Sequence, residues 1–186
     1  MDAAATKFGE NDKRPVKLFF QDEGRFGRID TLVGCWAPNG VRPCLEQQII
    51  RQYTHVFSAV CPWDGESFSL ILPYADTHAM TIFLNELSKE YSQYRVIIIM
   101  DGAAWHKSKN LGAFENVRII FQPPYSPELN PVEHLWEHIR EKYFWNRSWK
   151  SLADLEDALS KALVEVSNAK DTVRSLSSFH WLCFNV

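Results

Sequence analysis

The sequence lacks the features that mark secreted, zinc-clustered or membrane proteins. Its four cysteines, Cys35, Cys44, Cys61 and Cys183, include no C-x-x-C pair and no zinc-like spacing, and no secretory leader precedes them. This pattern favours a reduced, intracellular protein over one stapled by disulfides. The longest apolar runs are far shorter than the roughly 20 residues of a membrane-spanning helix. We therefore expect an intracellular chain with no membrane partner.

Positive charge is also scarce, because 20 Lys and Arg face 23 Asp and Glu and give a net charge of -3 at pH 7. Domains that bind nucleic acid without sequence preference are usually basic, so the net charge counts mildly against DNA binding. A carboxylate site and an acidic surface both lower that total, however, so local basic patches matter more than the sum.

The chain has no internal repeat and no low-complexity tract, which argues against solenoid and linker architectures. Its 186 residues, 46% of them apolar, are enough for one domain with a substantial core. Residues 1–15 mix small, charged and polar types without periodicity. We expect residues 1–15 to be a flexible leader and residues 16–186 to form a single domain.

Two short apolar runs each lead to an aspartate. Residues 96–100 are too few for a helix and stop at Asp101-Gly102, which indicates a central strand buried on both faces. Residues 16–20 indicate a second strand that ends at Asp22. Adjacent strands lie about 4.8 Å apart, so Asp22 and Asp101 are expected close enough to share a cation.

A third carboxylate follows a stiff loop. Residues 117–121 indicate another strand, and the loop at 122–131 contains four prolines, which exclude both helix and sheet ladder. Asn130 is a suitable N-cap and Pro131 suits the first helical position. The apolar residues that then recur at helical spacing are Val132, Leu135, Trp136, Ile139 and Tyr143. This helix holds Glu133 near the core boundary and turns His134 and His138 to the far face.

Three such carboxylates repel one another unless a metal neutralises them. Hard oxygen ligands without thiolates suit Mg²⁺ or Mn²⁺, and two such ions can activate a nucleophile and stabilise the leaving oxygen of a phosphoryl displacement. Taken singly, Asp22 or Asp101 is more often a turn residue at a strand end, and Glu133 a capping residue. Their combination with the PPYSPELNP segment reverses that judgement.

Three segments, QDE at 21–23, MDGAAWH at 100–106 and PPYSPELNPVEHLW at 123–136, resemble the catalytic domain of DDE transposases, specifically the bacterial IS630 and Tc1/mariner superfamily. The resemblance implies an α/β fold with a ribonuclease H-like mixed sheet flanked by helices. It places Asp22, Asp101 and Glu133 at the catalytic and metal-binding positions, with two Mg²⁺ or Mn²⁺ ions. The implied activity is DNA strand cleavage and strand transfer at transposon ends.

The resembling transposases act as oligomers on paired DNA ends and carry a DNA-binding domain ahead of the catalytic one. No helix-turn-helix pattern precedes residue 16 here. The chain therefore resembles the catalytic part alone, and we expect a homo-oligomer on DNA that works with an upstream DNA-binding domain or a separate polypeptide.

The remaining elements are expected to complete a mixed sheet. Residues 31–37, 55–61 and 67–72 indicate an antiparallel meander, and Asp76 caps a helix that leads to the strand at 96–100. Ser151-x-x-Asp154 is typical of a capping box that opens a further helix. Antiparallel strands followed by alternating strands and helices indicate a mixed sheet with helices on its faces.

Basic residues near the expected site have two interpretations. Arg25 and Arg28 lie in the glycine-punctuated segment EGRFGR, where they either meet DNA phosphates or belong to a solvated turn. His106 and Lys107 follow Asp101 and either approach a phosphate or belong to an ordinary loop.

Two other functions remain open. His134, Glu137 and His138 match the H-x-x-E-H motif of inverted zinc proteases, although no specific third ligand follows. The chain is alternatively a non-catalytic relic that acts as a DNA-binding or protein-binding module.

Overall fold

The computed structural model describes residues 8–9, 11–29, 31–44, 47–103, 111–124 and 126–179. The strands are β1 (Val16–Ile29), β2 (Ile49–Val60), β3 (Ser67–Leu72), β4 (Arg95–Met100) and β5 (Val117–Phe121). The helices are α1 (Thr77–Glu90), α2 (Val132–Ile139), α3 (Leu152–Asn168) and α4 (Lys170–Ser177), with a 3₁₀ turn η1 (Pro127–Leu129) and a π-helical turn η2 (Arg140–Phe144). None of the helices in these ranges is long and apolar enough to span a membrane.

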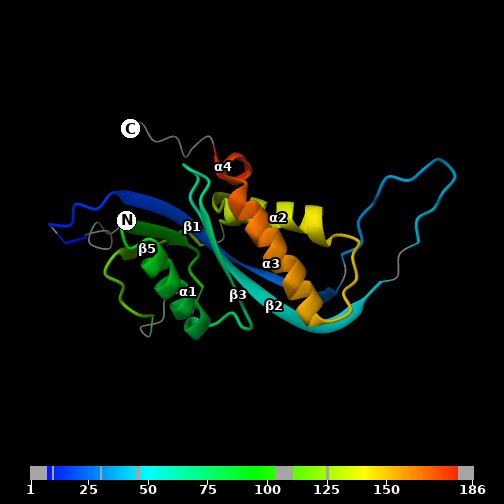
Figure 1. Cartoon of the computed structure of the whole chain (residues 1–186), viewed down its shortest axis with the longest axis horizontal. Coiled ribbons are helices and arrows are strands. Elements are labelled where there is room, and N and C mark those ends of the chain that lie inside the picture. The colour runs from blue at the N-terminus through cyan, green and yellow to red at the C-terminus, as the bar shows by residue number, and fades with distance from the viewer. Residues whose placement is uncertain are drawn as a thin grey trace.

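The five strands form one mixed sheet in the order β3-β2-β1-β4-β5 (Figure 1). β1 and β3 each pair with β2 in the antiparallel direction, whereas β4 pairs in parallel with both β1 and β5. The expected mixed sheet is therefore confirmed.

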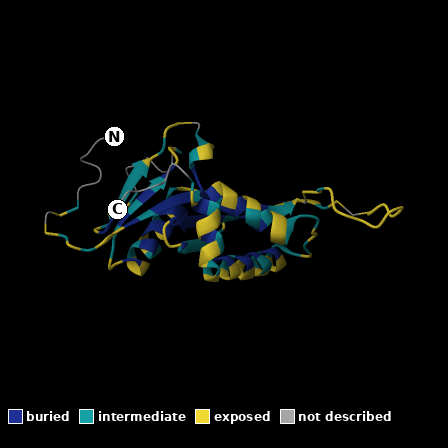
Figure 2. Cartoon of the chain, turned by 90° about the horizontal axis from the view of Figure 1, so that it is seen from above, coloured by how far each residue is buried: buried dark blue, intermediate teal, exposed yellow. Residues whose placement is uncertain are grey.

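Helices cover both faces of the sheet, and successive side chains of β1 point to opposite faces. Phe19 contributes to the core against α1, where Met80 and Phe83 are fully buried. Phe20 contributes to the core against α2 and α3, which includes Trp136 and Leu159. Figure 2 shows the buried residues concentrated between these layers.

β1 changes its partner part-way along its length. It pairs with β4 from Val16 to Phe20, and with β2 from Phe20 to Ile29. The predicted end of this strand at Asp22 is therefore wrong, as is the predicted turn in EGRFGR. Both glycines of that segment make room for aromatic rings, since a Cβ would lie 3.0 Å from the Trp136 ring at Gly24 and 2.2 Å from the Tyr53 ring at Gly27.

Most other elements follow the prediction. β3 and β5 have the expected bounds, and the expected caps are present: Asp76 Oδ1 accepts from Ala79 N at 2.8 Å and Ser151 Oγ accepts from Asp154 N at 3.0 Å. The predicted strand at 31–37 is wrong, because residues 31–38 have no regular structure and the segment projects from the sheet (Figure 1). α4 was not predicted, because its sequence KDTVRSLS is polar and buries only Val173 and Ser177.

Candidate active site

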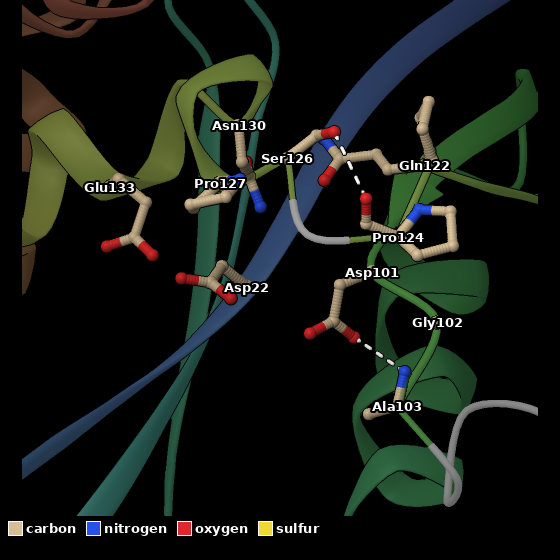
Figure 3. Close-up of a pocket in the computed structure, with 11 residues that line it drawn as sticks. Asp22, Asp101, Gly102, Ala103, Gln122, Pro124, Ser126, Pro127, Asn130 and Glu133 are labelled. Atoms are coloured by element: carbon tan, nitrogen blue, oxygen red, sulfur yellow. Dashed lines mark hydrogen bonds between the residues drawn. The ribbon is translucent and has the colours of Figure 1, made fainter.

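Three acidic residues from separate elements line one pocket of about 430 Å³ (Figure 3). Asp22 comes from the middle of β1, Asp101 directly follows β4, and Glu133 lies in the first turn of α2. The other lining residues are Gly102, Ala103, Gln122, Pro123, Pro124, Ser126, Pro127 and Asn130. In Figure 3, Asp22 lies between Asp101 and Glu133. The structure thus brings together the three carboxylates that the sequence singled out.

Strand register places the two aspartates. The parallel pairing of β1 with β4 ends at Phe20 and Ile99, and Asp22 and Asp101 each follow two residues later. Because side chains alternate along a strand, both point to the face that α2 covers. Asp101 Oδ1 also accepts a hydrogen bond from Ala103 N at 3.0 Å, which orients this carboxylate at the strand end.

The proline-rich loop fixes Glu133 through contacts at both of its ends. Gln122 N donates to Met100 O at 2.8 Å, where β4 ends. Asn130 is buried, and its Nδ2 donates to Gln21 O at 2.9 Å while its Oδ1 accepts from Val132 N at 3.2 Å. Asn130 therefore ties the start of α2 to the strand residue that precedes Asp22. The helix begins one residue later than predicted.

The environment of Asp22 disfavours its charged form. Burial of the carboxyl and the nearby charge of Glu133 raise the pKa of Asp22 to about 7, against the opposing effect of a hydrogen bond from Trp136. Trp136 Nε1 donates to Asp22 Oδ2 at 2.9 Å. The sequence indicated Trp136 only as a core residue, although a buried indole N–H usually requires an acceptor, and that requirement was the available signal.

The donor set of the pocket fits a hard divalent cation. The charged groups that could ligate a metal there are all carboxylates. In the described part of the chain, no lysine or arginine forms an ion pair with Asp22 or Glu133. Across the described ranges, no three His, Cys, Asp or Glu side chains are gathered closely enough to hold an ion as they stand. A bound cation would therefore have to draw the carboxylates together, and its positive charge would offset their mutual repulsion.

The family described as DDE superfamily endonuclease matches residues 17–156, a span that contains Asp22, Asp101 and Glu133. The chain belongs to this family. It is also 38% identical over 104 residues to the uncharacterized protein y4pE/y4sA of Sinorhizobium fredii, in an alignment that covers 55% of this chain and 77% of that protein.

Solved structures of the Mos1 transposase share the fold of this DDE endonuclease domain. The Mos1 strand transfer complex superposes with a TM-score of 0.58 at 14% identity, covering 88% of this chain and 55% of that chain. The Mos1 paired-end complex with Mn gives a TM-score of 0.59, also at 14% identity, covering 88% of this chain and 56% of that chain. The ribonuclease H-like fold is thus confirmed, and the chain spans little more than half the length of the Mos1 chain.

The DDE endonuclease domain does not bring the predicted arginines to the pocket. At about 3.3 Å per residue, β1 carries Arg28 roughly 20 Å beyond Asp22. The Arg25 guanidinium lies over the Tyr53 ring at 4.8 Å, and Arg28 donates to Trp149 O at 2.8 Å. Both arginines thus make contacts within the protein, and neither lines the pocket.

The other predicted residues do not contribute a described contact to the pocket. His106 and Lys107 lie outside the described residues. His134 Nδ1 lies 3.1 Å from Leu176 O of α4, so the helix face predicted to point away from the core is partly covered. Neither histidine of the H-x-x-E-H motif lines the pocket, and the described residues offer no third ligand for zinc.

Proposed function

We propose that this chain is the catalytic domain of a DDE-type transposase of the IS630 and Tc1/mariner group. As a polynucleotidyl transferase, it cleaves DNA strands at transposon ends and joins them to a target. One observation carries the proposal: Asp22, Asp101 and Glu133, which are far apart in the sequence of a DDE endonuclease-family chain, line one pocket.

The proposed roles follow from the position of each side chain. Asp22, Asp101 and Glu133 would hold two Mg²⁺ or Mn²⁺ ions, which supply activation of the attacking water or 3′-hydroxyl and stabilisation of the leaving oxygen. Asp22 comes from the sheet interior and is half-buried, so its position is the most constrained. Asp101 and Glu133 are exposed, which leaves the pocket open to a DNA backbone.

The partners are also part of the proposal. Residues 16–186 act as one catalytic domain behind a leader at 1–15, together with an upstream DNA-binding domain or a separate polypeptide. The net charge of -3 supports this division, because such a domain has little intrinsic affinity for DNA. The similar Mos1 structures include a paired-end complex with the left transposon end, which supports action as a homo-oligomer on DNA.

The test is cleavage of labelled DNA by this chain fused to a matching upstream DNA-binding domain, with Mg²⁺, with Mn²⁺ and with chelator. We expect metal-dependent cleavage that is lost in Asp22→Ala, Asp101→Ala and Glu133→Ala, because these side chains hold the same ions. His134→Ala and His138→Ala serve as controls on the same helix and should retain cleavage.

The alternatives give different results in the same assay. DNA binding without cleavage under every metal condition would identify a non-catalytic binding module. Inactive histidine variants, active carboxylate variants, stoichiometric zinc and peptide hydrolysis would instead identify a zinc protease.

A further inference from the structure

We propose that Trp136 is a positioning residue, which fixes the orientation of the Asp22 carboxylate before a cation binds. Its indole commits Asp22 Oδ2 to the protein and leaves Oδ1 as the oxygen that meets the cation. This inference rests on the proposed function, since it assigns a role within the same site.

The contact itself is well defined. Trp136 is 1% exposed, and its Nε1 donates to Asp22 Oδ2 at 2.9 Å. An indole N–H can only donate, and it is not ionised, so it holds the carboxylate without neutralising it. An arginine or lysine in its place would cancel the charge that a divalent cation requires. Trp136 therefore orients Asp22 and preserves its capacity to bind metal.

The position of the indole is fixed by the strand beneath it. A Cβ at Gly24 would lie 3.0 Å from Trp136 Cδ2 and 3.1 Å from Cε2, so the indole packs directly against the β1 backbone. Gly24 is two residues from Asp22 and therefore on the same face of β1. The Phe26 ring meets the indole edge-on, with centroids 6.0 Å apart. The absent side chain at Gly24 thus provides the space that lets Trp136 reach Asp22.

The same helix also carries a candidate ligand. Trp136 is three residues after Glu133, one turn along α2, so both side chains project from neighbouring positions of one rigid element. Asn130 anchors the start of this helix to Gln21 O, next to Asp22. α2 therefore sets the position of Glu133 and the orientation of Asp22 together, and a shift of the helix would disturb both.

The first test compares Trp136→Phe with Trp149→Phe in Mn²⁺ binding without DNA, measured by electron paramagnetic resonance of the free ion. Both changes remove an indole and keep an aromatic ring, but the pocket is not lined by Trp149. We expect Trp136→Phe to weaken Mn²⁺ binding about tenfold, as loss of a hydrogen bond to a metal ligand typically does, and Trp149→Phe to bind like wild type. In the cleavage assay, excess metal should partly restore Trp136→Phe.

A second readout uses the wild-type chain labelled with ¹⁵N-tryptophan. The indole N–H signal that disappears in Trp136→Phe should shift in Asp22→Asn, and Mn²⁺ should broaden it before the other indole signals. Gly24→Ala is a second variant, which retains the tryptophan but should displace its indole from Asp22, because the added Cβ would lie against the ring. It should weaken Mn²⁺ binding in the same direction, and it decides the question if Trp136→Phe does not fold.

Wild-type Mn²⁺ affinity in folded Trp136→Phe and in Gly24→Ala would overturn the positioning role alone. A Trp136 indole signal that neither shifts in Asp22→Asn nor broadens with Mn²⁺ would also overturn the positioning role alone. A wild-type chain that binds no Mn²⁺ would overturn the proposed function, and this inference with it.

Discussion

Two groups of carboxylates neighbour β1 residues whose side chains point to opposite faces of the sheet, and the groups differ in the cations that the described residues supply. On the α1 face, Lys17 Nζ lies 2.6 Å from both Asp64 and Glu66, and Glu66 also meets Lys170 Nζ at 3.1 Å. We call these four residues the Lys17 cluster. On the other face, the neutral indole of Trp136 is the only side-chain donor to Asp22 among the described residues.

The protonation behaviour follows this difference. In the Lys17 cluster, burial is the largest single influence and raises the pKa of Asp64 and of Glu66, but the hydrogen bonds and charge of Lys17, together with other hydrogen bonds, outweigh it and lower both pKa values. In the pocket, burial and Glu133 raise the pKa of Asp22 to about 7. The comparison shows that the fold places a buried lysine between the carboxylates of the Lys17 cluster, whereas no lysine or arginine of the described residues forms an ion pair with Asp22 or Glu133.

The largest expected effect is on the Lys17 cluster. Lys17→Met leaves two carboxylates beside each other without their buried cation, since the Lys17 side chain is only 6% exposed. We expect a loss of about 3 kcal/mol in the free energy of unfolding, at the lower end for buried pairs because Asp64 and Glu66 still reach solvent. Urea denaturation measures the loss. Lys89→Met, which removes an exposed i,i+3 pair with Glu86, is the control, and an equal loss in both variants would contradict this account.

The pocket should respond in the opposite sense. In chelator at pH 8, Asp22→Asn removes a disfavoured charge but keeps an oxygen that can accept from Trp136, so we expect a gain of about 2 kcal/mol in the free energy of unfolding. A carboxyl whose folded pKa is raised destabilises the fold fully above that pKa, and the penalty fades as the pH falls toward its ordinary value. The gain should therefore shrink between pH 8 and pH 4.5 in urea titrations. Asp157→Asn on the exposed face of α3 should show no such trend, and a gain that is constant with pH would exclude Asp22 as its source.

Metal should narrow that difference. A cation that binds only the folded chain stabilises it by mass action, by about 1 kcal/mol at five times its dissociation constant. Thermal melts with chelator and with millimolar Mg²⁺ should show a larger gain for wild type than for Asp22→Asn, which lacks one charged ligand. Equal gains would mean that Asp22 does not hold the cation.

The smallest effect is expected at the rim of the Lys17 cluster. The Lys170 side chain is 56% exposed, and Glu66 still has Lys17 as a partner when Lys170 is replaced. Lys170→Met should cost about 0.5 kcal/mol, which is typical of an exposed ion pair. Urea denaturation beside Lys17→Met tests it, and a comparable loss would show that the exposed lysine, not the buried one, balances the cluster.

The sequence predicts those parts of the fold that depend on local signals. β3, β5 and α1 follow from apolar runs, periodicity and the Asp76 cap, and the three carboxylates follow from strand ends and a motif. The course of β1 beyond Asp22 does not, because its glycines serve contacts with Tyr53 and Trp136, and Trp136 is 112 residues from Gly24. Neighbours that distant cannot be read from glycine content, which locally indicates a turn.

Two further errors have the same origin. The apolar character of residues 31–37 suggested a strand, but a strand needs a partner, and none of the described strands pairs with this segment. The hydrogen bond between Trp136 and Asp22 joins residues 114 positions apart, so the sequence showed two unrelated features, a core tryptophan and a strand-end acid. The raised pKa of Asp22 depends on that same long-range packing.

The placement of Asp22 within a continuous strand constrains how copies of this sequence can diverge in length. Removing a single residue between Val16 and Asp22 would turn the aspartate to the α1 side, because alternate strand residues face opposite ways. The projecting segment at 31–44 is not subject to this alternation of faces, since it does not pair with a strand of the sheet. Insertions and deletions among related copies should therefore accumulate in that segment and be absent from the first seven residues of β1.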